Sequence, residues 1–302
     1  MKHQREFIGE LLGTFILVLF GCGSMAVTVL FDAHPGLLQV AVVWGMGVTL
    51  AIYATRHLSC AHLNPAVSVA MVAGKRMSAD RLPAYLTAQF AGAFLAAVVL
   101  YGLFSGSIAA YELAHGIERG SPESVKTAMI FGEFYPNPGA GTAAHVSFLN
   151  AFCAEAIGTF TLVVMIFALT EGCNVGRPDD RLAPLFVGAT VASVICLIAP
   201  LTQAGINPSR DFSPRIFAWA AGRGSAAFPA DHYGFLTVYV LAPLIGGVTA
   251  SLVFVWLLER LMKAQPNDCK CEPLLMKGPG NVDARNQSQG PERVLWENSA
   301  EQ

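Results

Sequence analysis

Asn64-Pro65-Ala66 and Asn207-Pro208-Ser209 are the two stretches that decide how this 302-residue chain folds. Asn is favoured just before a helix, because its side-chain oxygen accepts a backbone N–H of the first turn. Pro suits the first helical position, where its missing N–H would have no partner. Each stretch therefore predicts the start of a short apolar helix, over 64–74 and 207–222.

An internal repeat surrounds these two stretches. Glu10-Leu-Leu-Gly13-Thr14-Phe15 precedes the first Asn-Pro pair, and Glu155-Ala-Ile-Gly158-Thr159-Phe160 precedes the second. Gly92, after the first pair, has a counterpart in Gly246, after the second. Because the order of these features is kept, the chain consists of two similar halves.

The composition indicates a membrane protein. Hydrophobic residues make up 54% of the chain and charged residues only 13%, whereas soluble proteins carry about 25% charged residues. The apolar residues gather in six stretches long enough to span a bilayer core, which takes about 20 residues. The expected spans are 7–31, 37–55, 82–104, 146–170, 182–202 and 235–258.

Each half contains three spans, so the two halves enter the membrane from opposite sides. Inverted repeats of this kind place the functional site at their interface. The two short helices then meet near the midplane, where non-helical backbone is tolerated only if it lines an aqueous cavity. The sequence predicts an all-α membrane protein with six transmembrane helices, two re-entrant half-helices and a pore.

Two helix N-termini that face each other give this pore its chemistry. Their positive dipole ends repel cations and hydrated protons, while a neutral hydroxyl accepts hydrogen bonds from the amides of Asn64 and Asn207. Arg210 lies one helical turn beyond Asn207, and an Arg in an apolar stretch is expected to face a cavity. Asp211 is expected to hold neighbouring loop backbone, and Arg215 to pair with it.

Glu10 and Glu155 occupy equivalent places in the two halves. As proton-relay carboxylates they would indicate a proton-coupled secondary transporter. As structural carboxylates they would accept hydrogen bonds from the irregular backbone ahead of each half-helix. Their symmetric placement favours the structural role.

Charged loop residues predict the orientation. With the N-terminus inside, fourteen Lys and Arg residues lie on the inner side and five on the outer side, so both termini are expected in the cytoplasm. The expected organisation is then a cytoplasmic N-terminus over 1–6, a channel domain over 7–260 and a cytoplasmic tail over 261–302. Within the channel domain, the repeats cover about 7–104 and 146–258, and an extracellular loop over about 105–145 joins them.

The tail is rich in Pro, Gly, Asn, Gln and Glu, a composition typical of disorder. Its Cys269 and Cys271 would make only a weak metal site, because two thiols leave a soft metal incompletely held. No cofactor or metal is expected in the channel.

These motifs resemble the major intrinsic protein family, in particular its aquaglyceroporin branch and the bacterial glycerol facilitators. The residues that carry the resemblance are Ser-Cys-Ala-His-Leu-Asn-Pro-Ala at 59–66, Ala-Gln-Phe-Ala-Gly-Ala at 88–93 and Asn-Pro-Ser-Arg-Asp-Phe at 207–212. Asp211, Arg215 and Pro243-Leu244 match glycerol channels rather than water channels. The resemblance implies a right-handed bundle with one pore per subunit, assembled as a homotetramer in the cell membrane.

The resemblance also implies a narrow filter near the outer mouth, where glycerol channels combine two aromatic residues, a Gly and an Arg. The corresponding residues here are Trp44, Ala204, Ile195 and Arg210, so one aromatic residue is lost and Ile replaces Gly. Ala204 widens the filter and Ile195 adds an apolar wall; Gln203 remains an alternative to Ala204 as the residue that faces the pore. Backbone carbonyls are expected to form a ladder of acceptors from Cys60, Ala61, His62, Leu63, Gln203, Ala204, Gly205 and Ile206.

The expected function is a passive channel for water and small neutral solutes such as glycerol, other polyols and urea. A proton-coupled secondary transporter is the main alternative. An ion channel and a non-conducting structural protein are disfavoured by the facing dipoles and by the paired Asn-Pro motifs with Arg210. The net charge of −2 suggests no nucleic-acid partner, and no catalytic constellation indicates an enzyme.

Overall fold

Six helical segments are long and apolar enough to cross a membrane in the part of the chain that the computed structural model describes, namely residues 3–34, 36–143, 145–229 and 231–264. Five are single helices: α1 (Gln4–Phe31), α2 (Leu37–Thr55), α4 (Leu82–Ala114), α6 (Phe148–Thr170) and α7 (Ala183–Thr202). The sixth joins α9 (Gly234–Leu236), η7 (Thr237–Leu241), α10 (Ala242–Val253), η8 (Phe254–Leu258) and α11 (Glu259–Ala264). The tail beyond 264, with its expected disorder and Cys269 and Cys271, lies outside the described residues.

Two shorter helices begin at the Asn-Pro pairs. They are α3 (Pro65–Ala73) and α8 (Pro208–Ala218), and each has Pro at its first position. The connecting segments hold α5 (Val125–Ala128) and the short turns η1 (Ala79–Arg81), η2 (Pro122–Ser124), η3 (Pro138–Ala143), η4 (Trp219–Arg223), η5 (Gly224–Ala227) and η6 (Asp231–Tyr233). No β-strand occurs among the described residues. The predicted all-α architecture of six spans and two half-helices is confirmed.

Three expected boundaries differ from the structure. Helix α4 continues to Ala114 instead of ending near 104, so the start of the expected outer loop at 105 was wrong. Ile108 and Glu112, four residues apart, are both buried and keep this extension packed. Helix α11 continues to Ala264, so the boundary expected at 261 falls within a helix. The second half-helix ends at Ala218 rather than at 222, where Gly222 has a φ of 93°.

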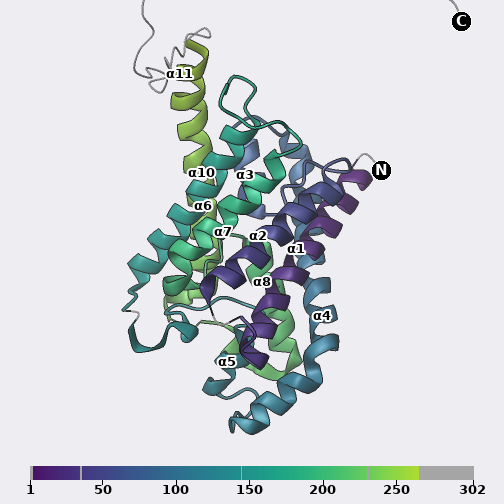
Figure 1. The fold of residues 1–302 in the computed structure, drawn as a ribbon, viewed down its shortest axis with the longest axis vertical. Coiled ribbons are helices and arrows are strands. Elements are labelled where there is room, and N and C mark those ends of the chain that lie inside the picture. The colour runs from purple at the N-terminus through teal and green to yellow at the C-terminus, as the bar shows by residue number, and fades with distance from the viewer. Residues whose placement is uncertain (1–2, 35, 144, 230, 265–302) are drawn as a thin grey trace, which may run out of the picture. The chain divides into compact units, whose positions relative to one another are not determined.

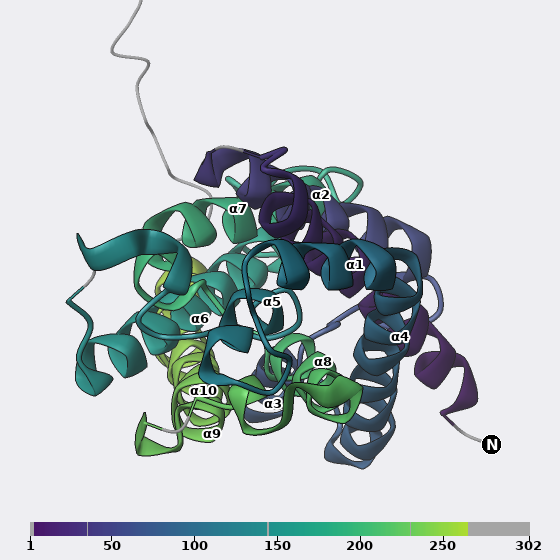
Figure 2. The same ribbon diagram turned by 90° about the horizontal axis from the view of Figure 1, so that it is seen from below.

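The helices form a ring, closed on one side by the two half-helices. In order, α4 packs on α1, α1 on α2, α2 on α7, α7 on α6, and α6 on α10. Helix α3 packs on α10, and α8 packs on α4, so the half-helices fill the gap between α10 and α4 (Figure 2). Figure 1 shows the N-terminal end of α1 and α11 toward one end of the bundle and α5 toward the other.

Small residues allow the helices to cross closely. A Cβ at Gly92 of α4 would lie 2.3 Å from the carbonyl oxygen of Leu11, and one at Gly246 of α10 would lie 2.1 Å from that of Ala156. The outer faces are apolar: Leu103 is 69% exposed and Leu197 is 70% exposed. Such faces suit hydrocarbon or another apolar surface rather than water.

Candidate functional site

The two half-helices meet through their Asn side chains. Oδ1 of Asn64 accepts the N–H of Ala66 at 2.8 Å, and its Nδ2 donates to the carbonyl of Ile206 at 2.9 Å. In the other half, Oδ1 of Asn207 accepts the N–H of Ser209 at 3.1 Å, and its Nδ2 donates to the carbonyl of Leu63 at 2.8 Å. Each Asn thus caps its own helix and binds the backbone ahead of the other. Because an amide nitrogen carries two hydrogens, each Nδ2 keeps one donor for a solute.

The backbone ahead of each Asn is strained in the same way. Ala61 and Leu63 have φ of 50° and 55°, and Ala204 and Ile206 have φ of 63° and 42°. A left-handed conformation costs a non-glycine residue about 1–2 kcal/mol. Strain of this kind persists only where surrounding contacts hold it, and two buried carboxylates supply those contacts.

Glu10 holds the first strained segment. Its Oε1 accepts the N–H of His62 at 2.9 Å and the hydroxyl of Ser59 at 2.7 Å, and its Oε2 accepts the N–H of Leu63 at 2.7 Å. Nε2 of Gln89 donates to the same Oε2 at 2.7 Å. Glu10 is fully buried, so these four donors replace the hydration that a carboxylate would have in water.

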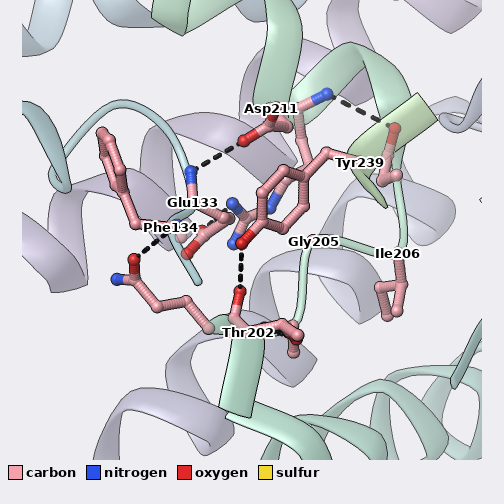
Figure 3. A network of polar contacts seen from close by, with 12 residues as sticks. Glu133, Phe134, Thr202, Gly205, Ile206, Asp211 and Tyr239 are labelled. Carbon is pink, nitrogen blue, oxygen red and sulfur yellow. Dashed lines mark hydrogen bonds and ion pairs between the residues drawn. The ribbon is translucent and has the colours of Figure 1, made fainter. Parts of the chain in front are cut away.

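Glu155 holds the second segment with three donors. Its Oε1 accepts the N–H of Gly205 at 2.8 Å and the hydroxyl of Thr202 at 2.6 Å, and its Oε2 accepts the N–H of Ile206 at 2.6 Å. The hydroxyl of Tyr239 donates to the carbonyl of Thr202 at 3.0 Å, as Figure 3 shows. Both carboxylates are therefore occupied by backbone and neighbouring side chains.

A cavity of about 670 Å³ runs past both Asn side chains. Trp44, Ile195, Ala204 and Arg210, the four residues expected in the filter, all line it, together with Asn64 and Asn207. The expected ladder residues that line it are Cys60, Ala61, His62, Leu63, Ala204, Gly205 and Ile206. Much of the remaining wall is apolar, with Leu17, Val48, Val67, Leu162, Val187 and Val191, but Arg56, Arg76, Thr170 and Asp180 also line the cavity.

Gln203 is the expected ladder residue that does not line this cavity. Its side-chain oxygen accepts the N–H of Phe134 at 2.8 Å. Between the two residues that the sequence left open, the structure places Ala204 on the cavity wall. Gln203 turns toward residues 129–137 between α5 and η3, which belong to the loop expected on the outer side and are called the outer segment below.

Arg210 is buried and held from two sides. The carbon at the centre of its guanidinium lies 4.0 Å from the centroid of the Trp44 ring, a cation–π contact. Its Nη1 donates to Oε1 of Glu133, a residue of the outer segment between α5 and η3. Sequence reasoning missed Glu133. The available signal was that it is the one acidic residue in the otherwise apolar run 128–135.

Asp211 and Arg215 form a buried ion pair behind Arg210. Nη2 of Arg215 lies 2.6 Å from Oδ1 of Asp211, and both side chains are fully buried. Oδ1 of Asp211 also accepts the N–H of Glu133 at 2.7 Å, and Nη2 of Arg215 donates to the carbonyl of Glu133 at 2.5 Å. The pair therefore fixes the outer segment against α8 instead of facing the cavity.

The opposite end of the bundle carries a partly exposed ion-pair cluster. Arg76, just after α3, pairs with Glu171 and lies 3.3 Å from Glu259, and its guanidinium covers the ring of Phe167 at 4.6 Å. Burial raises the pKa of Glu171, but the hydrogen bonds from Arg76 and from the N–H of Cys173 outweigh it, so the pKa lies below its ordinary value. Glu171 is thus stabilised as a carboxylate.

Within the described residues, no three His, Cys, Asp or Glu side chains gather closely enough to hold a metal ion. The structure thus has six spans and two half-helices, and each half-helix is joined to the other by the hydrogen bond of its Asn side chain. With the cavity that passes both Asn residues, this arrangement defines a membrane channel built from an inverted repeat.

Comparison with known proteins places this channel in a family. Residues 1–254 match the major intrinsic protein family, and the chain belongs to it. It is a multi-pass membrane protein. The resemblance seen in the motifs is confirmed.

Relatives at 36–39% identity carry names from the transport of small polyols. The chain is 39% identical to the glycerol uptake facilitator protein of Escherichia coli over 86% of its own length and 88% of the relative's. It is 36% identical to a propanediol uptake facilitator of Citrobacter freundii, over 89% of this chain and 97% of the relative. The X-ray structure of the aquaglyceroporin from Plasmodium falciparum superposes with a TM-score of 0.75 at 26% identity, and covers 87% of this chain and all of that one.

Proposed function

We propose that this protein is a passive channel for glycerol and other small neutral solutes, including polyols, urea and some water, and that it is not an enzyme. One observation carries the proposal: a single cavity is lined both by the donors Asn64, Asn207 and Arg210 and by many apolar side chains. The names of the relatives support the same solute class.

Such a cavity suits a molecule with hydroxyl groups along one side and C–H groups along the other. The hydroxyls accept hydrogen bonds from the Asn amides and donate to the backbone carbonyls of the two strained segments. The C–H side passes over Trp44, Ile195 and the aliphatic wall. When a solute exchanges its hydration water for these partners, the free-energy cost of entering the pore is small, and rapid passage is possible.

Cations and protons are excluded by the two helix N-termini. Helices α3 and α8 both begin at the cavity, and the positive ends of their dipoles disfavour a cation there. The donors of Asn64 and Asn207 add to this field. A water chain that accepts from both Asn residues cannot relay a proton through that point.

Ala204 and Ile195 set the expected solute range. A small side chain at 204 leaves room for longer polyols, while Ile195 makes the wall more apolar. We therefore expect solutes with one apolar side, such as diols, to pass at rates comparable to glycerol.

The proposal includes both termini in the cytoplasm and a homotetramer in the cell membrane. The inner excess of Lys and Arg supports the orientation. The start of α1 and α11 at one end of the bundle agrees with it (Figure 1). The exposed apolar helix faces offer surface both to lipid and to neighbouring subunits.

The decisive experiment is stopped-flow light scattering on proteoliposomes with water, glycerol, urea and larger polyols. Wild-type protein should accelerate glycerol entry, and Asn207→Asp should abolish most of it, because the carboxylate cannot donate to the Leu63 carbonyl or to a solute. Asn150→Asp is a matched control, since Asn150 is exposed at the start of α6. Ala204→Phe should slow larger polyols more than glycerol.

Two results would contradict the proposal. Folded wild-type protein that conducts no solute faster than empty liposomes would rule out a channel. Glycerol uptake that depends on a proton gradient would instead favour the coupled transporter.

A further inference from the structure

Glu133 is a buried acid in contact with the filter but outside the membrane spans. Its side chain is 3% exposed, and its Oε1 accepts from Nη1 of Arg210. Its Oε2 is buried and accepts no hydrogen bond from any described residue. An unsatisfied buried carboxylate oxygen is costly and indicates a place for a donor.

The main chain around Glu133 is fixed to the pore on three sides. The N–H of Glu133 donates to Asp211, its carbonyl accepts from Arg215, and the N–H of Phe134 donates to Gln203, two of which Figure 3 shows. A Cβ at Gly132 would lie 2.8 Å from the guanidinium carbon of Arg215, so the segment lies directly on that side chain. The carboxylate is therefore held in place by the backbone around it.

Glu133 changes the charge at the outer end of the filter. The groups that meet there are two cations, Arg210 and Arg215, and two carboxylates, Asp211 and Glu133. Their formal charges cancel. Asp211 pairs with Arg215, so without Glu133 the charge of Arg210 would be uncompensated and would attract anions.

Glu133 also adds a hydrogen-bond acceptor beside a donor. Within the described residues, Nη1 is the only side-chain nitrogen of Arg210 that donates to the protein, and the guanidinium lines the cavity. A hydroxyl group both donates and accepts. Glu133 does not itself line the cavity, so Oε2 reaches a solute only when the side chain turns toward it; a hydroxyl can then accept from Arg210 and donate to Oε2, which an anion cannot do.

We propose that Glu133 is a selectivity residue of the pore, which neutralises Arg210 against anions and supplies the acceptor that makes this end specific for hydroxyl-bearing solutes. The inference rests on the proposed channel function and deepens it. On this proposal the outer segment takes part in recognising the solute, together with the two half-helices.

The test compares glycerol and nitrate entry into proteoliposomes made with full-length wild type, Glu133→Gln and Glu133→Ala. Nitrate entry is followed as swelling in potassium nitrate with valinomycin. In Glu133→Gln, the amide oxygen still accepts from Arg210 but an NH₂ donor replaces Oε2, so the acceptor for the solute is lost and glycerol permeability relative to water should fall about three- to tenfold. Nitrate permeability should rise at least about tenfold, because the Arg210 charge is no longer compensated.

Glu133→Ala removes both carboxylate oxygens, and with them the acceptor, the charge and the contact with Arg210. Glycerol permeability relative to water should then fall about three- to tenfold, the loss expected for one hydrogen bond. The matched controls are Glu123→Gln and Glu123→Ala, because Glu123 is exposed in the same outer region. They should leave both permeabilities unchanged.

The outcomes separate the two proposals. Wild-type protein that conducts no solute overturns the channel itself. A conducting wild type whose Glu133→Gln variant still excludes nitrate overturns the charge role, and an unaltered ratio of glycerol to water permeability in Glu133→Ala overturns the acceptor role. If Glu133→Ala fails to fold, the Gln variant still decides the charge role.

Discussion

The two half-helix regions, 59–73 and 202–218, share a scaffold but differ in chemistry. Both have left-handed residues ahead of an Asn that caps its helix and binds the opposite backbone. Beyond the Asn, the first half continues with Val67-Ser68 and the second with Arg210-Asp211. The geometry that opens the pore is thus duplicated, whereas the charged groups that contact the filter belong to one half.

Ser68 and Asp211 make this difference concrete, because they occupy equivalent positions. Ser68 accepts from Nε2 of Gln89 at 2.9 Å and lies 3.2 Å from Nδ1 of His62. Asp211 instead binds a fully buried Arg215. A neutral hydroxyl is sufficient where α3 packs on the bundle, while α8 needs a carboxylate to anchor the outer segment.

The largest effect is expected from substitution at these two positions. Asp211→Asn should lower the free energy of unfolding by about 3–5 kcal/mol, because it leaves Arg215 buried without a counter-charge. Ser68→Ala should cost only about 1 kcal/mol, the net value of a typical hydrogen bond. Both losses are measured by heating the detergent-solubilised variants and using size-exclusion chromatography to quantify the protein that remains folded. Equal losses would mean that the two halves are stabilised alike and that the comparison is wrong.

The carboxylates ahead of the two half-helices give a second, smaller contrast. Glu10 accepts four donors, two on each oxygen, whereas Oε2 of Glu155 accepts, among the residues that the structure describes, only the N–H of Ile206. In Glu10→Gln the new NH₂ group must face two donors, but in Glu155→Gln it need face only one. We expect Glu10→Gln to be the more destabilising by about 1–2 kcal/mol.

Midpoints of thermal unfolding in the same detergent check this order. Glu118→Gln is the control, because Glu118 is exposed in the outer region. Greater loss in Glu155→Gln would show that the number of donors does not determine the stability of the strained segments.

Much of this architecture could be predicted from the sequence, because it depends on local signals that occur twice. Asn-Pro pairs begin helices wherever they precede an apolar run, and the repeated Glu-x-x-Gly-Thr-Phe stretch marks equivalent carboxylates. Glu133 could not be found in this way. It has no counterpart in the first half, and its partner Arg210 is 77 residues away in the chain. Its contact depends on how the outer segment folds back onto α8.

Helix ends that depend on packing were also beyond sequence reasoning. The extension of α4 to Ala114 is held by Glu112, whose carboxylate accepts from Thr127 at 2.7 Å and pairs with Arg119 at 2.6 Å. Neither partner lies in the same helix. A search for apolar spans therefore stops where the hydropathy falls, although the helix does not.

The smallest expected effect concerns the ion pair that follows α3, which contrasts with the buried pair in α8. The side chains of Arg76 and Glu171 are 24% and 10% exposed, so the pair should contribute about 1 kcal/mol or less. The pKa of Glu171 is lowered from 4.5; the contribution is therefore present above pH 4.5 and lost as the pH falls through the lowered value. Thermal midpoints of wild type and Glu171→Gln should differ slightly at pH 7 and converge below pH 4.5. Because solvent reaches this pair, 1 M salt should also remove the difference, whereas the loss in Asp211→Asn should survive it. A difference that persists in acid and in salt would mean that Glu171 acts through packing rather than through its charge.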